Sequence, residues 1–132
     1  MAKRNVIKLE TPPVMFTIIG ISSHENDYRL SWSINEQLGH SFTQGDSLET
    51  ESGKEFPCFV HEDDDQRLML ISNRCDDGFL LDKYKNFDFI LKFDGEMNET
   101  GMVAWLSDLK KVPLVSAVFP IPFNKKMLQL FG

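Results

Sequence analysis

The most constraining feature of this sequence is the stretch 16–38, where an apolar run passes through a short polar turn into an amphipathic segment. Residues 14–21 are almost wholly apolar and rich in isoleucine, which predicts a central β-strand buried on both faces. The residues that follow predict a helix that ends at Leu38, because Gly39 suits the position just after a last helical turn. We therefore expect a strand and a helix in succession at the centre of the fold.

The start of this helix can be predicted from its capping residues. Ser22 and Ser23 are favourable N-cap residues, and Glu25 follows Ser22 by three positions, as in a capping box. The GISSH stretch at 20–24 also resembles the nucleophile elbow of a hydrolase, but His24 stands where that motif needs its second glycine. We therefore interpret Ser22 as a helix cap, worth about 1 kcal/mol, and not as a nucleophile.

Polar side chains interrupt the apolar face of the predicted helix. Leu30, Ile34 and Leu38 form one apolar stripe, and the aromatic residues Tyr28 and Trp32 lie on the other side of the same face. Between them runs a polar seam at positions i, i+3, i+7 and i+11, which consists of His24, Asp27, Ser31 and Asn35. Such a seam indicates either a hydrogen-bonded structural network or a site.

The seam and its neighbours supply the residues of a candidate site. The leading hypothesis is a non-catalytic protein-interaction or ligand-binding surface, because aromatic, guanidinium and amide groups on one helix can stack on a partner and hydrogen-bond to it. Its residues are His24, Asp27, Tyr28, Arg29, Trp32 and Asn35. The alternative is a small enzyme in which Asp27 orients His24 and the two act as an acid–base pair.

The segments on either side of this unit predict further strands. Residues 1–13 form a polar arm with strand-forming residues, interrupted by two prolines. Residues 56–61 and 67–73 predict an antiparallel hairpin in which Cys58 lies opposite Ile71. The hairpin adds an antiparallel pair to the central strand.

The second half of the chain completes the predicted fold. Residues 87–93 alternate as a strand with one apolar face, 98–112 predict a second helix, and 114–119 predict a last strand that ends at Pro120. Residues 125–132 form a short amphipathic tail. Two helices with apolar faces must cover one face of a sheet, so we expect a single-domain α+β two-layer sandwich with a largely antiparallel sheet. The specific topology we predict is ferredoxin-like, enlarged by a hairpin.

The net charge of −6 lies mainly in the middle of the chain. Residues 46–65 hold eight carboxylates and one lysine, so this segment carries −7 and the remaining residues +1. Nucleic-acid binding needs a clustered positive field, so DNA and RNA are not expected partners. The acidic run 62–65 lacks the pattern of an EF-hand, and phosphate-binding or zinc motifs are absent, so we expect a solvated hairpin tip, no metal and no cofactor.

The expected setting of the protein is the cytoplasm. No apolar run approaches the roughly 20 residues of a membrane helix, and the first residues lack the apolar region of a secretion signal. Cys58 and Cys75 have neither CxxC nor metal spacing, which favours reduced thiols over a disulfide. We expect no membrane contact, and a partner that is an unknown protein or a small molecule, with a homodimer as one option.

Three stretches of the sequence carry a family resemblance, namely residues 22–35 (SSHENDYRLSWSIN), 70–74 (LISNR) and 112–120 (VPLVSAVFP). They resemble the IPExxxVDY family of small bacterial proteins, which come mainly from Bacteroidetes, and the last stretch stands in the place of the motif that names the family. Pro113 and Val118 match that motif, whereas its Glu, Asp and Tyr are replaced by Leu114, Phe119 and Pro120. The resemblance implies a shared fold and a cytoplasmic bacterial setting. It implies no mechanism, because the family has no established activity.

Overall fold

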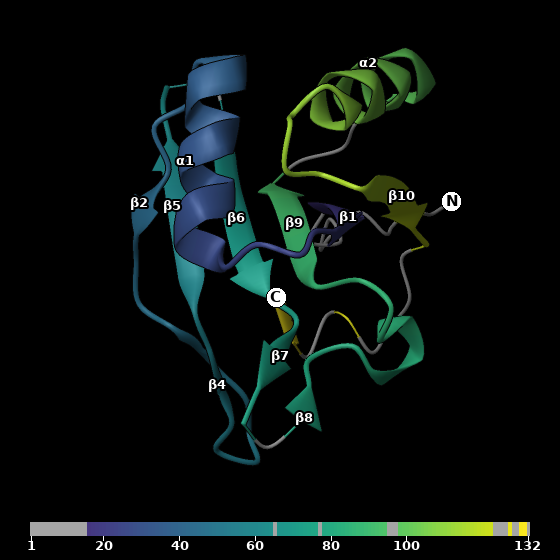
Figure 1. Ribbon diagram of the computed structural model, residues 1–132. Coiled ribbons are helices and arrows are strands. Elements are labelled where there is room, and N and C mark those ends of the chain that lie inside the picture. Colours follow the sequence, from purple (N-terminus) through teal and green to yellow (C-terminus); the bar gives the residue numbers. More distant parts are fainter. Residues whose placement is uncertain are drawn as a thin grey trace, which may run out of the picture.

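Figure 1 shows the fold in a computed structural model, which describes residues 16–64, 66–76, 78–94, 98–122, 127, 130 and 131. The arm predicted for residues 1–13 lies outside the described residues, as does most of the tail predicted for 125–132. In chain order the elements are β1 (Phe16–Ser22), α1 (Asp27–Leu38), β2 (Thr43–Gln44), β3 (Leu48–Glu49), β4 (Glu55–Phe56), β5 (Cys58–Glu62), β6 (Arg67–Ser72), β7 (Arg74–Cys75), β8 (Gly78–Phe79), the 3-10 helix η1 (Asp82–Tyr84), β9 (Phe89–Asp94), α2 (Glu99–Lys110) and β10 (Ala117–Ile121).

Six strands of the described chain form one antiparallel sheet in the order β10-β1-β9-β6-β5-β2. Because β9 is antiparallel to both of its neighbours, β1 and β6 run parallel to each other, and α1 lies on the connection between them. By the same reasoning β9 and β10 run parallel on either side of β1, and α2 connects them. These two split β-α-β units are the predicted ferredoxin-like arrangement, which β5 and β2 extend beyond β6.

Both helices pack on the same face of the sheet (Figure 1). Leu30 and Ile34 of α1 and Leu109 of α2 belong to one buried cluster with Ile19 and Leu91, which are cross-strand partners in the central strands β1 and β9. Clusters of this kind form because each helix must bury its apolar stripe against the apolar face of the sheet. The predicted α+β sandwich with two helices on one face is therefore confirmed.

The opposite face of the sheet is buried as well, under short irregular segments. Ile18 of β1 and Ile90 of β9 belong to a second cluster with Phe56, and the β3–β4 and β7–β8 ribbons and η1 lie on this side. A Cβ atom placed on Gly20 would lie 2.5 Å from Cδ2 of Phe87, so this ring packs directly on the bare backbone of β1. The apolar run in β1 is thus buried on both faces, as predicted.

The capping box predicted at Ser22 is wrong. Ser22 is the last residue of β1, and its hydroxyl donates to the backbone carbonyl of Asn86 at 2.9 Å. The true N-cap is Asn26, whose side-chain oxygen accepts a hydrogen bond from the backbone N–H of Arg29 at 2.9 Å. Asn caps helices as well as Ser does, and Ser22 is held in the ladder between β1 and β10. The predicted end of the helix is confirmed, with Gly39 at φ 70°.

The hairpin register is confirmed. Cys58 of β5 pairs with Ile71 of β6, and both Cys58 and Cys75 are free thiols. The last strand is shifted from its predicted position, because β10 runs through Pro120 and ends at Ile121. Among the strands of the described sheet β10 pairs only with β1, and an edge strand tolerates a residue without a backbone N–H.

Candidate functional site

A pocket of about 350 Å³ opens beside the start of α1, and two of the predicted site residues line it. The pocket lies where the parallel strands β1 and β6 end and where β9 begins between them, so it joins segments that are distant in sequence. Its walls consist of Ser23, His24, Glu25, Asn26, Asp27, Ser72, Arg74, Asp88 and Phe89. The structure therefore brings His24 and Asp27 to one place, together with charged residues that the sequence analysis did not single out.

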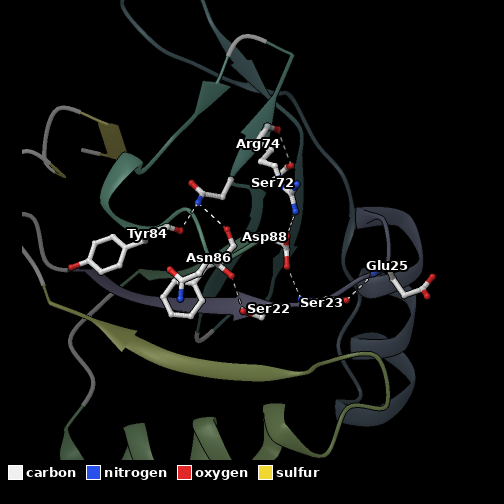
Figure 2. Close-up of polar contacts among 10 residues, drawn as sticks. Ser22, Ser23, Glu25, Ser72, Arg74, Tyr84, Asn86 and Asp88 are labelled. Carbon is white, nitrogen blue, oxygen red and sulfur yellow. Dashed lines mark hydrogen bonds and ion pairs between the residues drawn. The ribbon is translucent and has the colours of Figure 1, made fainter.

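Asp88 connects the walls of this pocket (Figure 2). The backbone N–H of Ser23 donates to Oδ2 of Asp88 at 2.9 Å, and Oδ1 forms an ion pair with Nη2 of Arg74. The hydroxyl of Ser72 donates to the backbone carbonyl of Arg74 at 3.0 Å, and the Ser23 hydroxyl accepts from the backbone N–H of Glu25 at 3.1 Å. Both carboxylate oxygens of Asp88 are engaged, which ties the ends of β1 and β6 to the start of β9.

Asn73 anchors the segment that leads into β9. Its side chain is fully buried, its Nδ2 donates to the carbonyls of Tyr84 and Phe87 at 3.0 and 2.9 Å, and its Oδ1 accepts from the backbone N–H of Leu81 at 2.8 Å. The backbone N–H of Asn73 also donates to the carbonyl of Asp88 at 2.9 Å. A buried amide with all of these partners fixes the pocket wall. The sequence analysis missed Asn73, because one Asn in a turn-rich stretch has the signature of an ordinary turn residue.

His24 and Asp27 share the pocket without a hydrogen bond or ion pair between them in the described chain. His24 is exposed and lies in the bend before α1, whereas Asp27 is the first residue of the helix. The helical spacing predicted for these two residues is therefore wrong, since the helix begins after His24. An acid–base pair needs the carboxylate within hydrogen-bond distance of the imidazole, and this arrangement does not provide that contact.

The other two residues of the predicted seam hold the fold together. Asn35 connects α1 to the segment before β2 through two hydrogen bonds. Its Nδ2 donates to the carbonyl of Phe42 at 3.1 Å, and its Oδ1 accepts from the Phe42 N–H at 2.7 Å. Ser31 is buried, and its hydroxyl donates to the carbonyl of Tyr28 at 3.0 Å. Both ends of the Asn35 amide are occupied within the fold, which places Asn35 outside the pocket.

The outer face of α1 carries the remaining candidate residues. Tyr28 is 71% exposed and Trp32 is 62% exposed, so these rings lie at the surface and not in the core. One edge of Tyr28 contacts Phe59 of β5, with ring centroids 6.3 Å apart. Arg29 forms an ion pair with Glu25 at 3.2 Å. Tyr28, Arg29 and Trp32 are therefore accessible together, but they do not line the pocket.

A second polar cluster, which the sequence analysis missed, joins α2 to the hairpin. His40 stacks on Trp105 of α2, with centroids 5.4 Å apart and planes 10° apart, and lies 4.7 Å from the His61 ring. The backbone N–H of Ser41 donates to Nδ1 of His61 at 3.0 Å, so the ring proton is on Nε2, which faces Asp63 at 3.2 Å. Burial lowers the pKa of His40, the neighbouring His61 lowers it further, and Asp63 opposes both effects.

The hairpin tip is exposed at Glu62, Asp63 and Asp64, and Oδ1 of Asp63 accepts from the backbone N–H of Gln66 at 2.9 Å. No group of three or more His, Cys, Asp or Glu side chains in the described chain could hold a metal ion. No helix among the described residues is both long and apolar enough to cross a membrane.

No family model matches this chain, and no curated protein matches it. The resemblance of residues 22–35, 70–74 and 112–120 to the IPExxxVDY family therefore stays a prediction. The fold and the site define a ferredoxin-like α+β domain with a polar pocket at the start of α1 and an exposed aromatic pair on the outer face of the same helix.

Proposed function

We propose that this protein is a non-catalytic interaction module in which the outer face of α1 binds a basic segment of a partner protein. The observation that carries the proposal is the exposure of Tyr28 and Trp32, which lie four residues apart on successive turns of one helix. Tyr and Trp dominate the energetics of many interfaces, because each buries a large apolar area and keeps a polar atom for a hydrogen bond.

The charge around these rings favours a basic partner. Glu25 is paired with Arg29, so the carboxylates of Asp27 and Glu36 give residues 24–38 their net negative charge. Lysine and arginine side chains stack on exposed aromatic rings with a gain of about 0.5–1 kcal/mol per contact, and nearby carboxylates add to the attraction. The net charge of −6 draws a basic segment toward the protein over a longer range.

The same charges argue against the other functions considered. A homodimer built on α1 would place two acidic faces against each other, which opposes association. A small enzyme with His24 and Asp27 as its acid–base pair is not favoured, because no hydrogen bond joins these two described residues.

The free thiols support the cytoplasmic setting that is part of this proposal. Burial raises the pKa of the Cys58 thiol, which keeps this thiol protonated and unreactive.

The proposal can be tested with synthetic peptides rich in lysine and arginine, and with glutamate-rich peptides of the same length. Binding is followed by tryptophan fluorescence and by amide NMR shifts of the full chain. We expect the basic peptides to shift the resonances of residues 28–36, with affinity that falls as salt rises, and the acidic peptides to have no effect. Basic peptides that leave these resonances unchanged would contradict the proposal.

The variants Trp32→Ala and Tyr28→Ala identify the surface. Each should weaken peptide binding about tenfold, in line with the loss of an aromatic anchor. Because Trp32 is exposed, its replacement should cost less than about 1 kcal/mol of stability, so lost binding cannot be attributed to unfolding. Val103→Ala is the matched control, since Val103 is 64% exposed on α2 and should leave binding unchanged. Equal binding by all three variants would place the interaction elsewhere.

A further inference from the structure

We infer that the pocket at the start of α1 binds a small zwitterion, a molecule with one carboxylate and one ammonium group such as a free amino acid. The inference does not depend on the proposed partner surface, because Tyr28 and Trp32 do not line the pocket. It depends on charges of both signs that face one cavity, with one group of each sign available for a ligand.

Arg74 provides the positive group. Its guanidinium carries five N–H donors, and Nη2 is engaged by Asp88. The second hydrogen of Nη2 and the hydrogens of Nε and Nη1 have no partner among the described residues, and the side chain is 59% exposed, so a ligand can reach a paired set of donors. Guanidinium groups bind carboxylates through paired hydrogen bonds that fix the orientation of the ligand. One ligand carboxylate can therefore occupy the free side of Arg74.

Asp27 provides the negative group. The other two carboxylates of the pocket are occupied, because Glu25 is paired with Arg29 at 3.2 Å and Asp88 uses both of its oxygens. Asp27 has no partner in the described part of the chain and is half-buried at the pocket wall. An ammonium group placed against Asp27 would form a charge-assisted hydrogen bond, which is stronger than a hydrogen bond between neutral groups.

The size and rigidity of the pocket suit a ligand of this class. A volume of about 350 Å³ is at the small end of the range for ligand sites, which fits an amino acid and not a nucleotide or a larger cofactor. Phe89 adds an apolar wall against which a ligand side chain can pack. The contacts of Asp88 and Asn73 hold the walls in place before a ligand arrives, so little ordering is needed on binding.

The experiment uses the twenty L-amino acids as probes, added one at a time to the full-length protein and followed by amide NMR shifts. For each amino acid that binds, its amide and its N-acetyl derivative serve as matched probes that lack the negative or the positive charge. We expect shifts at Ser23, Asp27, Ser72 and Arg74, and binding about tenfold weaker for either derivative. Equal binding of an amino acid and its two derivatives would overturn the inference, as would the absence of pocket shifts with every amino acid.

Two variants test which pocket residue binds each charged group of the ligand. With Arg74→Met the amino acid should bind no better than its amide, and with Asp27→Asn no better than its N-acetyl derivative. Lys110→Met and Asp108→Asn remove the same charges from the exposed part of α2 and should leave binding unchanged. Thermal unfolding checks that each variant is folded. Asp27→Asn leaves the ion pair between Arg74 and Asp88 in place, so this variant still tests the inference if Arg74→Met is unstable. Wild-type binding by Asp27→Asn would refute the assignment.

Different variants test the partner surface of α1 and the amino-acid pocket, so either proposal can be refuted without the other. Trp32→Ala should weaken peptide binding about tenfold and leave amino-acid binding intact, whereas Asp27→Asn should have its main effect on the amino acid. Loss of amino-acid binding in Trp32→Ala would show that the two sites are not independent.

Discussion

Asn73 is the single residue on which the wall of the pocket most depends. Its amide bonds the buried carbonyl of Phe87 and the buried N–H of Leu81, as well as the partly buried carbonyl of Tyr84, and a buried backbone group is costly to leave without a partner. No apolar side chain of similar size could replace it, because the segment before β9 has no regular ladder to pair its own backbone. The role of Asn73 is therefore to bond the backbone, and its side chain does not line the pocket.

Replacing Asn73 with Ala should lower the free energy of unfolding by about 3 kcal/mol, because the buried carbonyl of Phe87 and the buried N–H of Leu81 lose their partner. The carbonyl of Tyr84 keeps the hydrogen bond from the Phe87 N–H. Urea denaturation followed by circular dichroism measures the change. Asn86→Ala is the control: Asn86 is exposed, and only its backbone carbonyl accepts a hydrogen bond in the described structure, so the stability should stay within about 0.5 kcal/mol of wild type. A small effect of Asn73→Ala would show that water can take over these hydrogen bonds.

At the scale of elements, α2 is joined to the β5 side of the sheet by aromatic rings. Trp105 of α2 stacks on His40, and His40 in turn faces His61 and Asp63 at the end of the hairpin. A neutral imidazole packs favourably between these rings, whereas an imidazolium must lose much of its hydration there. We therefore expect the packing of α2 against the hairpin to weaken when His40 is protonated.

The pKa of His40 is lowered in the folded protein by burial and by His61, with Asp63 acting in the opposite direction, from an ordinary value of 6.5. The unfolded chain then binds this proton more readily than the folded one. The stabilisation is complete above the unfolded pKa and is lost as the pH falls through the folded pKa, so the free energy of unfolding should drop between about pH 7.5 and about pH 5.

His40→Phe keeps a ring against Trp105 and removes the titration, so its stability should fall less over this pH range than that of wild type. Urea denaturation at the two pH values measures the difference. His24→Gln is the control, since His24 is exposed and should leave the wild-type pH dependence in place. Identical pH profiles for wild type and His40→Phe would assign the acid sensitivity to other groups.

Elements with a long apolar pattern could be predicted from the sequence, whereas positions decided by distant contacts could not. The apolar run of β1 and the apolar stripe of α1 predict a buried strand and a packed helix, and both are present. The helix start was misplaced because Ser22 and Asn26 are equally good caps, and only the pairing of β1 with β10 distinguishes them. The two-residue strands β7 and β8 have no periodicity that a pattern could reveal.

The candidate site could be predicted only in part. His24 and Asp27 were singled out because they lie close together in sequence, and both line the pocket. Arg74 follows β6 and Asp88 precedes β9, so both reach the same pocket from segments distant from β1 in sequence, and their contribution depends on the strand order and not on any local motif. Helical periodicity predicts that Trp32 lies on an apolar face, whereas the structure leaves it exposed. Periodicity alone does not tell how far the sheet extends beneath that face.

At the scale of the whole molecule, both faces of the sheet are buried, one under α1 and α2 and the other mainly under short segments. The short segments over the second face contribute large apolar side chains to its buried cluster, among them Phe56, Leu80 and Phe87. Phe87 occupies the space left by the missing side chain of Gly20, and this contact holds the covering segment against β1. The size of residue 20 therefore limits how closely the second layer can approach the sheet.

Gly20→Ala should destabilise the protein by about 2 kcal/mol, because the added methyl group would lie within 2.5 Å of the Phe87 ring and force it out of position. Thermal and urea denaturation measure the cost. In a Phe87→Leu background the same substitution should cost less, since a smaller side chain leaves room for the methyl group. Additive effects of the two substitutions would show that the strain arises elsewhere.

The place of β1 in the sheet has a consequence for the order in which the chain can fold. Its two neighbours are β9 and β10, which come from the second half of the sequence, so none of its sheet contacts is local. Closing such long loops slows folding relative to a helical protein of similar size. During synthesis β1 is made before either neighbour. The backbone hydrogen-bonding groups of this isoleucine-rich strand therefore remain unpaired until β9 and β10 have left the ribosome. Nascent chains are therefore most exposed to aggregation at this strand.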